Sequence, residues 1–318
     1  MTTIPPRVRP GDTIGIVTPA GPVQRARLAQ GLACLGDVFA LRVADSVTAP
    51  RAPTTPSYLA APDEVRAREL NAMLADRDVR AIVCARGGYG IMRILPLLDA
   101  DLLRRDPKPI VGFSDATALL AWAYHAGVRG IHGPVIAQLG DLPADDTAHL
   151  VRLLTDPTPL GARAWSLRGA PDPAATVEIR APLIAGNLSL VSFLVGTPWP
   201  LPLRDALVLL EEVGERPYEI DRYLTQLVLT GALDGARGAV IGDLVRCRDA
   251  NPPAGTPDAD DAALATVIER LHAARLPIAI GAPIGHGSRN EAIPFAARAT
   301  LAFERERAVI SIDDAAVA

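Results

Sequence analysis

The chain has 318 residues, of which 49% are hydrophobic, 21% are charged and only 4% are aromatic. This length predicts about two domains, and the apolar content excludes an intrinsically disordered chain. The formal net charge of −4, from 32 basic and 36 acidic residues, excludes the electrostatic footprint of a nucleic-acid-binding protein or of one that binds an anionic membrane.

Strands and helices alternate along the first part of the sequence. Short apolar runs predict buried strands at residues 13–18, 79–85 and 109–113. Apolar residues at helical spacing predict helices at residues 63–76 and 116–126. Strands that alternate with helices form parallel sheets covered on both faces, so the predicted fold class is α/β.

Residues 140–175 are rich in Pro, Asp, Gly and Ala, and we interpret them as a crossover with a short helix at 149–154. Beyond it the sequence predicts strands at 176–180, 206–210, 239–244 and 278–281, helices after Asn187 and near Pro217, a polar loop at 249–261, and a β-hairpin from 299–303 and 308–312. The expected organisation is therefore a first domain at 1–140, a crossover at 141–175 and a second domain at 176–318.

Three scattered cysteines, Cys34, Cys84 and Cys247, are too few for a disulfide framework or a metal cluster. The N-terminal residues lack the apolar segment of a secretory signal. No apolar run reaches the roughly 18–20 residues that span a bilayer. These observations predict a soluble, cytoplasmic protein without a metal site.

The strongest local motif, at residues 112–115, joins a buried strand to a helix. Gly112 would allow a sharp turn, so that the Ser114 hydroxyl projects from the strand end as in a nucleophile elbow. The amide of Asp115 would lie at the helix N-terminus and could donate to an oxyanion. The complete motif has a glycine where Ala116 stands. The alternative is that Ser114 only caps the helix.

A glycine-rich segment at residues 86–90 follows another predicted strand. Its backbone amides could point at an anion, or it could be an ordinary turn between a strand and a helix. The dinucleotide fingerprint is absent from the first strand–helix turn, and no phosphate-binding loop motif occurs in the sequence. We therefore predict no cofactor.

A reactive serine needs a base, and a base needs a carboxylate that orients it. His286 is favoured because it lies in a glycine-flanked loop directly after a predicted strand, and His132 is its main competitor. Glu211 ends another buried strand. Strand alternation lets Glu212 point to solvent and turns Glu211 toward the covered face. Asn187 is a candidate either for a helix cap or for a ligand contact.

Together these segments resemble the LD-carboxypeptidase family of serine peptidases, which includes muramoyl-tetrapeptide carboxypeptidases and microcin C self-immunity proteins. The segments that carry the resemblance recur in family order at residues 11–20, 86–90, 111–115, 186–188, 210–222 and 285–287. The sequence departs from the family pattern at Ala185, where a second glycine is usual, and at Glu212, where an aspartate is usual.

The resemblance implies a role for each candidate residue. Ser114 would be the nucleophile, His286 the general base and then acid, and Glu211 the orienting carboxylate. The amides of Gly88 and Asp115 would form the oxyanion hole. The family has a Rossmann-like N-terminal domain with the serine and a C-terminal domain with the acid and the base. The site lies in the cleft between them, and members are typically homodimers without a metal.

The implied reaction removes the terminal D-alanine from a murein tetrapeptide in peptidoglycan recycling. Arg86 and Asn187 are candidates to bind the terminal carboxylate of this small peptide. The alternative substrate is a peptidyl-nucleotide conjugate, for which Trp165 is the candidate that would stack on the base. A second alternative is a non-enzymatic α/β protein that only binds a ligand.

Overall fold

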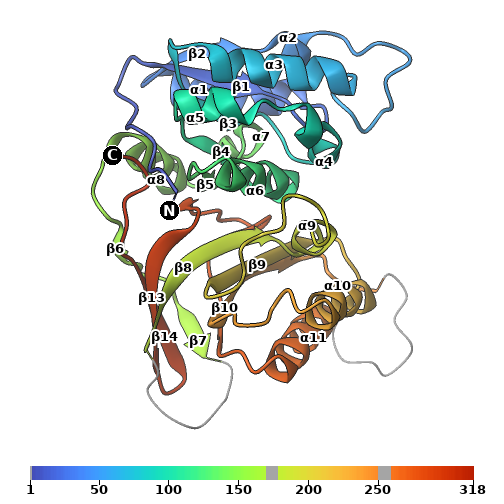
Figure 1. The fold of residues 1–318 in the computed structure, drawn as a ribbon, viewed down its shortest axis with the longest axis vertical. Helices are drawn as coiled ribbons and strands as arrows, with labels where there is room; N and C mark the ends of the chain where they lie inside the picture. The colour runs from blue at the N-terminus through green and yellow to red at the C-terminus, as the bar shows by residue number, and fades with distance from the viewer. Residues whose placement is uncertain (1, 170–177, 250–258) are drawn as a thin grey trace. The chain divides into compact units, whose positions relative to one another are not determined.

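A computed structural model describes residues 2–169, 178–249 and 259–318 of the chain (Figure 1). Contacts between residues divide the chain into two units. The first unit contains Met1–Thr158, Glu291–Phe295 and Ala315–Ala318, and the second contains Pro159–Asn290 and Ala296–Asp314. The first unit thus extends beyond residue 140 and includes two short segments from the end of the chain. The sequence predicts each domain as one continuous segment, so it does not predict that these two C-terminal segments belong to the first unit.

The first unit is built on a mostly parallel sheet. Its strands lie in the order β12 (Ile293–Pro294), β5 (Ile131–His132), β4 (Ile110–Gly112), β3 (Val79–Cys84), β1 (Thr13–Val17) and β2 (Ala40–Val43). Neighbouring strands from β5 to β2 are parallel, and β12 runs antiparallel to β5. Successive residues of β1 and β3 are buried, so both faces of the sheet are covered. The predicted α/β fold class is confirmed.

The helices of the first unit connect and cover these strands. They are α1 (Arg25–Gly36), α2 (Asp45–Thr48), α3 (Asp63–Ala75), α4 (Ile91–Ile94), α5 (Ala100–Arg105), α6 (Thr117–His125), α7 (Ile136–Leu139) and α8 (Ala144–Thr155), with 3-10 turns η1 (Leu95–Leu97) and η2 (Ser114–Ala116). The helix predicted at residues 149–154 is the second half of the longer α8. Helix α6 is almost entirely buried because it packs on β4 and β5 (Figure 1).

The second unit contains a sheet whose strand pairings form a closed ring, because β13, the first strand of the order, also pairs with β14. The strands are β13 (Ala297–Glu304), β8 (Glu178–Asn187), β9 (Leu207–Val213), β10 (Gly238–Val245), β11 (Ile278–Ile280), β7 (Leu167–Gly169), β14 (Arg307–Ile312) and β6 (Gly161–Ala162). Strands β8 to β11 are parallel, and β13 pairs with β14 as the predicted hairpin. The parallel strands carry the candidate residues of this unit.

Strand β8 is longer than the sequence predicts. The expected strand at 176–180 begins in residues outside the described ones, and β8 continues seven residues beyond Arg180 to Asn187. Its first half alternates between exposed and buried residues, whereas its last five residues are all buried. The predicted strand therefore ended before the continuously buried half of β8. Residues 250–258 of the predicted polar loop also lie outside the described residues.

Helices α9 (Leu188–Phe193), α10 (Pro217–Leu229) and α11 (Ala259–Ala273) cover part of this sheet. Helices α10 and α11 lie side by side, and α11 packs on β10 and β11 (Figure 1). Among the described residues, no helix has the length and apolar character needed to cross a membrane.

Candidate active site

Ser114 has a left-handed backbone conformation, with φ of +61°. A residue with a Cβ adopts this conformation at a cost of about 1–3 kcal/mol, and such strain concentrates at functional positions. The capping alternative does not explain it. The residue that caps η2 is Phe113, and neither η2 nor α6 has a side-chain cap hydrogen bond. The Ser114 conformation is that of the predicted elbow.

Gly112 is required by the tightness of this turn. A Cβ at Gly112 would lie 2.6 Å from the Cβ of Ala116 and 3.2 Å from Sγ of Cys84. Real Cβ atoms almost never approach as closely as the first distance, so the chain would have to shift. With glycine at 112, the small side chain of Ala116 fits where the complete motif has its second glycine.

The glycine-rich segment lies against the serine. A Cβ at Gly87 would be 3.0 Å from the Cβ of Ser114 and 3.1 Å from its Oγ. Gly88 follows with φ of +106°, a conformation that favours glycine. The two loops meet because β3 and β4 are parallel neighbours, so their carboxyl ends reach the same edge of the sheet. Ser114, Gly88 and Asp115 therefore belong to one backbone arrangement in the first unit.

The Asp115 side chain has a structural partner that the sequence does not reveal. It is 3% exposed, and its Oδ2 accepts a hydrogen bond from the Ile91 amide at 2.9 Å. Burial raises the pKa of Asp115 to about 6, although the hydrogen bond from Ile91, the charge of Arg66 and the hydrogen bond from Gly90 act in the opposite direction. The carboxylate thus connects the elbow to the start of α4.

Arg86 is exposed, and its Nη1 donates a hydrogen bond of 2.6 Å to the carbonyl of Pro22. Pro22 lies in the loop that follows β1. In this conformation the guanidinium connects two loops at the carboxyl edge of the sheet. Its predicted contact with a substrate carboxylate stays a prediction.

In the second unit, Glu211 and His286 are joined directly. Glu211, on β9, is fully buried, and its Oε2 lies 2.7 Å from Nδ1 of His286. The His286 side chain, in the loop after β11, is 20% exposed. A neutral imidazole that donates from Nδ1 carries its lone pair on Nε2, which suits a general base. The expectation that Glu211 faces the covered side of the sheet is confirmed.

Two further side chains hold the His286 loop, and sequence reasoning missed both. The amide of Gly285 donates to Oδ1 of Asn290 at 3.2 Å, and that of Gly287 donates to Oδ2 of Asp243 at 3.0 Å. Burial raises the pKa of Asp243, and the charge of Glu211 acts in the same direction. The only available signal was the place of Asp243 near the end of a predicted strand beside the one that carries Glu211.

The expectation that Glu212 points to solvent is wrong, because it is 2% exposed. Its Oε1 accepts from Nδ2 of Asn187 at 2.8 Å, and its Oε2 accepts from the Ser189 amide at 2.8 Å. Successive residues of β9 from Leu207 to Glu212 are all buried, so both faces of this strand are covered and alternation along it does not lead to solvent. Burial, and then the charge of Glu211, raise the pKa of Glu212 to about 7.

Asn187 caps α9. Its Oδ1 accepts from the Leu190 amide at 3.3 Å and from Oγ of Ser189 at 2.7 Å. These contacts, with the one to Glu212, support the capping interpretation of Asn187. A contact between Asn187 and a ligand stays a prediction.

His132, the competing base, is fully buried on β5. It pairs with Gly112 of β4, and its ring lies edge-on to Phe113 with centroids 6.2 Å apart. It therefore belongs to the first unit with Ser114, as expected from its proximity to the elbow. The imidazole that lies within hydrogen-bond distance of the Glu211 carboxylate is that of His286.

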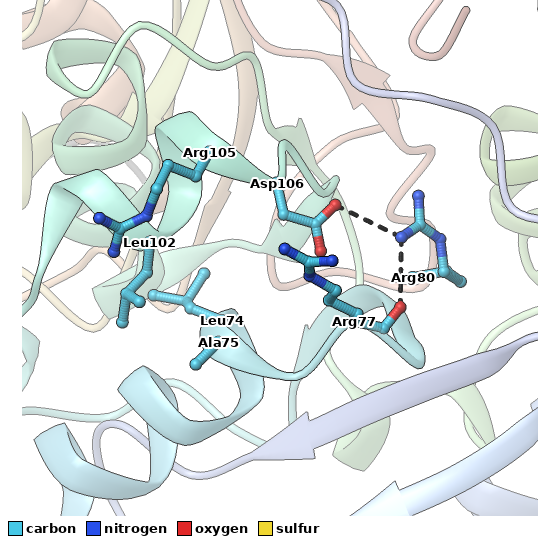
Figure 2. Close-up of a pocket in the computed structure, with 7 residues that line it drawn as sticks. All are labelled: Leu74, Ala75, Arg77, Arg80, Leu102, Arg105 and Asp106. Atoms are coloured by element: carbon cyan, nitrogen blue, oxygen red, sulfur yellow. Dashed lines mark hydrogen bonds and ion pairs between the residues drawn. The ribbon is translucent and has the colours of Figure 1, made fainter.

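The first unit has a pocket of about 360 Å³. Figure 2 shows the residues that line it. It is lined by Leu74, Ala75, Arg77, Arg80, Leu102, Arg105 and Asp106. These residues lie at or directly after the end of α3, at the start of β3, and in or directly after α5, whereas Ser114 follows the end of β4. Since these strands are parallel, the pocket lies at their amino ends and the serine at their carboxyl ends. The pocket includes none of the predicted site residues.

Comparison with protein families gives two matches in chain order. A family model described as the LD-carboxypeptidase N-terminal domain matches residues 14–133, and one described as the C-terminal domain matches residues 180–301. Together the two matches cover most of the chain.

Three curated relatives have long alignments to this chain. A putative carboxypeptidase of Streptomyces coelicolor is 40% identical, covering 76% of this chain and 78% of the relative. A probable murein peptide carboxypeptidase of Bacillus subtilis is 30% identical, covering 96% and 93%. A murein tetrapeptide carboxypeptidase of Pseudomonas aeruginosa is 30% identical, covering 79% and 81%.

Solved structures show the same fold. The muramoyltetrapeptide carboxypeptidase of Oxalobacter formigenes is 26% identical, with a TM-score of 0.79 over 95% of this chain and 99% of that one. A microcin self-immunity protein bound to aspartyl sulfamoyl adenosine has a TM-score of 0.81 over 99% and 100%, at 21% identity. The second likeness is one of fold alone.

Proposed function

This chain belongs to the LD-carboxypeptidase family and is a serine-type carboxypeptidase, and from that premise we propose that it removes the terminal D-alanine from murein tetrapeptides. The names of the Bacillus and Pseudomonas relatives support this substrate class. The cleaved amide would join the L-centre of a diamino acid to D-alanine. We further propose that the protein acts in peptidoglycan recycling, in the cytoplasm and as a homodimer.

The proposed reaction is acyl transfer through Ser114. His286 accepts the Ser114 proton at Nε2 as the oxygen attacks the carbonyl carbon of the scissile amide. Glu211 accepts the Nδ1 hydrogen bond, which fixes the tautomer and stabilises the imidazolium. The amides of Gly88 and Asp115 stabilise the oxyanion of the tetrahedral intermediate.

The intermediate then collapses with cleavage of the carbon–nitrogen bond. His286 donates its proton to the leaving amine, which departs as D-alanine and leaves an ester on Ser114. Water, deprotonated by His286, attacks this ester and restores the serine hydroxyl. We propose that Arg86, whose charge suits the task, binds the terminal carboxylate together with Asn187.

The observation that carries this proposal is the left-handed backbone of Ser114, at φ of +61°. Capping does not explain it, and the glycine-rich segment approaches the same side chain. A strained serine beside glycine amides supports nucleophilic catalysis rather than passive ligand binding.

Hydrolysis of peptidyl-nucleotide conjugates has less support. Trp165, the candidate for stacking on a base, is only 9% exposed. The likeness to the microcin self-immunity protein extends to the fold at 21% identity. Murein tetrapeptide is therefore the substrate that we propose.

Mass spectrometry of tetrapeptide digests tests the proposal. The wild-type protein is expected to release one D-alanine, and Ser114→Ala is expected to lose at least about 10⁴-fold of this rate. Ser57→Ala, at an exposed serine of the first unit, is the matched control and should act as wild type. Release by Ser114→Ala at the wild-type rate would contradict the nucleophile, and cleavage of an aminoacyl-adenylate analogue without D-alanine release would contradict the substrate.

A further inference from the structure

Arg66, on α3, is a charged side chain without access to solvent. The residue is 1% exposed although it lies in a helix that the sequence predicts to be amphipathic. A buried guanidinium is costly unless its donors are all paired, and apolar residues of similar volume often serve stability as well. The contacts of Arg66 therefore need an explanation beyond packing.

The guanidinium of Arg66 donates to three backbone carbonyls. Nε donates to Ala61 O at 3.0 Å, and Nη1 donates to Gly90 O at 3.0 Å and also to Pro19 O. Nη2 pairs with the carboxylate of Asp63. Pro19 follows β1, and Gly90 ends the glycine-rich segment after β3. Arg66 thus connects two loops at the edge of the sheet where Ser114 lies.

Gly90 is held from its other side by Asp115. The Asp115 carboxylate accepts hydrogen bonds from the amides of Gly90 and Ile91, and Arg66 binds the Gly90 carbonyl. Gly90 has φ of +126°, and a Cβ there would lie 2.6 Å from Cδ2 of Leu59 and 3.0 Å from Nη1 of Arg66. The peptide groups on both sides of Gly90 are therefore fixed by two buried, oppositely charged side chains.

The other end of the segment touches the serine. A Cβ at Gly87 would be 3.5 Å from the Asp115 amide as well as 3.0 Å from the Cβ of Ser114. The Gly21 amide, in the loop after β1, donates to Gly87 O at 3.1 Å. A movement of Gly90 would consequently be transmitted over two residues to Gly88, the proposed oxyanion donor.

We propose that Arg66 and the Asp115 carboxylate form a clamp on Gly90 that holds the amide of Gly88 where the oxyanion of the tetrahedral intermediate develops. This inference rests on the proposed function. Arg66 and the Asp115 side chain are positioning residues, since they act through the backbone of the glycine-rich segment. A guanidinium suits this task because its donors lie in one plane on three nitrogens and so reach separated carbonyls and a carboxylate, whereas the three donors of an ammonium group share one nitrogen.

The clamp predicts a loss in kcat with little change in KM. One oxyanion donor is worth about 10²–10³-fold in kcat, and a misplacement of about 1 Å costs on the order of 10²-fold. Arg66→Lys keeps the charge but loses the fork of donors, so kcat for D-alanine release should fall by about 10²-fold with KM within about threefold. The thermal midpoint shows whether the variant is folded.

Arg93→Met is the matched control. Arg93 binds the same Asp63 carboxylate, with Nε 2.8 Å from Oδ2, but its side chain is 41% exposed and it donates to no loop carbonyl among the described contacts. Its kcat should stay within about threefold of wild type. Equal losses in Arg93→Met and Arg66→Lys would overturn the clamp, because the ion pair to Asp63 would then account for the effect.

The rate at which a fluorophosphonate labels Ser114 gives a second readout. Ser114 displaces fluoride from this probe, and the phosphoryl oxygen gains negative charge in the pentacoordinate transition state. Labelling therefore depends on the oxyanion donors but not on recognition of a peptide. Arg66→Lys should slow labelling about as much as it lowers kcat. Wild-type labelling by folded Arg66→Lys would overturn the clamp, and so would a loss that appears only in KM.

If Arg66→Lys does not fold, Asp115→Asn replaces it. This variant keeps the shape and the backbone amide of Asp115 but offers one acceptor oxygen instead of two. Labelling should slow by about tenfold, and an unchanged rate would overturn the clamp. If wild-type protein is labelled at Ser114 but releases no D-alanine, the proposed function fails while the labelling rates still decide the clamp.

Discussion

The two units build their reactive residues by different means. Around Ser114 the arrangement is made by the backbone, with a left-handed serine, a turn that admits only glycine at 112 and a glycine-rich segment in contact with the side chain. Around His286 it is made by side chains, because Glu211, Asp243 and Asn290 hold the imidazole and its loop through hydrogen bonds.

This difference determines what each region tolerates. A backbone arrangement is disturbed by any added atom, even one that changes no charge, because interiors are packed closely. A side-chain arrangement tolerates small changes in shape but depends on which groups are ionised. Substitutions in the first region should therefore act through geometry, and those in the second through protonation and hydrogen bonding.

The prediction with the largest expected effect tests whether the reaction at Ser114 of the first unit needs His286 of the second. His286→Ala should lower kcat/KM by at least about 10³–10⁴-fold, because the serine would lose its proposed base. Added to Ser114→Ala it should cause little further loss, since residues that act as a unit are not additive. D-alanine release by the single and double variants measures both effects.

His132→Leu is the comparison for this experiment. It removes the buried histidine of the first unit and should leave turnover within about tenfold of wild type when the protein is folded. Loss of turnover in His132→Leu together with wild-type turnover in His286→Ala would assign the base to the first unit. This result would contradict the proposed division of roles between the two units.

A smaller effect is expected from one added methyl group in the backbone arrangement. Gly87→Ala places a Cβ 3.0 Å from the Cβ of Ser114, so the serine must move by a few tenths of an ångström. We expect kcat to fall by about 10–100-fold, with a thermal midpoint close to that of wild type.

Gly36→Ala is the matched control, because its Cβ would meet nothing closer than Cδ1 of Leu41 at 3.9 Å. It lies in α1 and should have wild-type turnover with equal or slightly higher stability. Wild-type kcat in Gly87→Ala would show that the serine region adapts more freely than its contacts indicate.

The smallest effect concerns ionisation in the second region. The pKa of Glu212 is raised to about 7 from an ordinary value of 4.5, so the folded protein binds this proton more tightly than the unfolded chain does. Its contribution to the free energy of unfolding is thus complete below pH 4.5 and is lost as the pH rises through 7. Glu212→Gln should flatten the decline in stability between pH 4.5 and 7.

Urea unfolding at pH 5 and pH 8 measures this change, which linkage limits to about 3 kcal/mol. Glu269→Gln, at a side chain that is 70% exposed, is the control and should follow the wild-type dependence on pH. Identical pH dependence in Glu212→Gln and wild type would show that the buried carboxylate does not titrate in this range.

Sequence patterns predicted the elements whose burial is continuous or regular. β1, β3 and β4 have apolar runs, and α3 and α6 have helical spacing. Strands β5 and β12 have two residues each, too few for any period, and β2 alternates between intermediate and exposed residues, so no apolar run marks it. The sequence therefore predicted the class of the fold and the central strands of the first sheet but not its outer strands β2, β5 and β12.

The same reasoning explains what the sequence revealed of the site. Ser114, Glu211 and His286 follow or end predicted strands, so the local pattern marked them as candidates, and the family resemblance gave them their proposed roles. The prediction for Glu212 was wrong because it assumed that one face of the strand is exposed to solvent. Arg66 was not recognised, since the carbonyls that it binds at Pro19 and Gly90 lie 47 and 24 residues away in the sequence.

The return of the chain to the first unit has a consequence for biosynthesis. Strand β12 pairs with the outer edge of β5, and the last residue, Ala318, donates its amide to Pro5 O. A ribosome therefore synthesises β6 to β11 of the second sheet before the first sheet receives β12. Until then the edge of β5 has backbone groups without their final partners, and nascent copies on one messenger could pair there wrongly. Protecting this edge until β12 has been synthesised is a task suited to a chaperone.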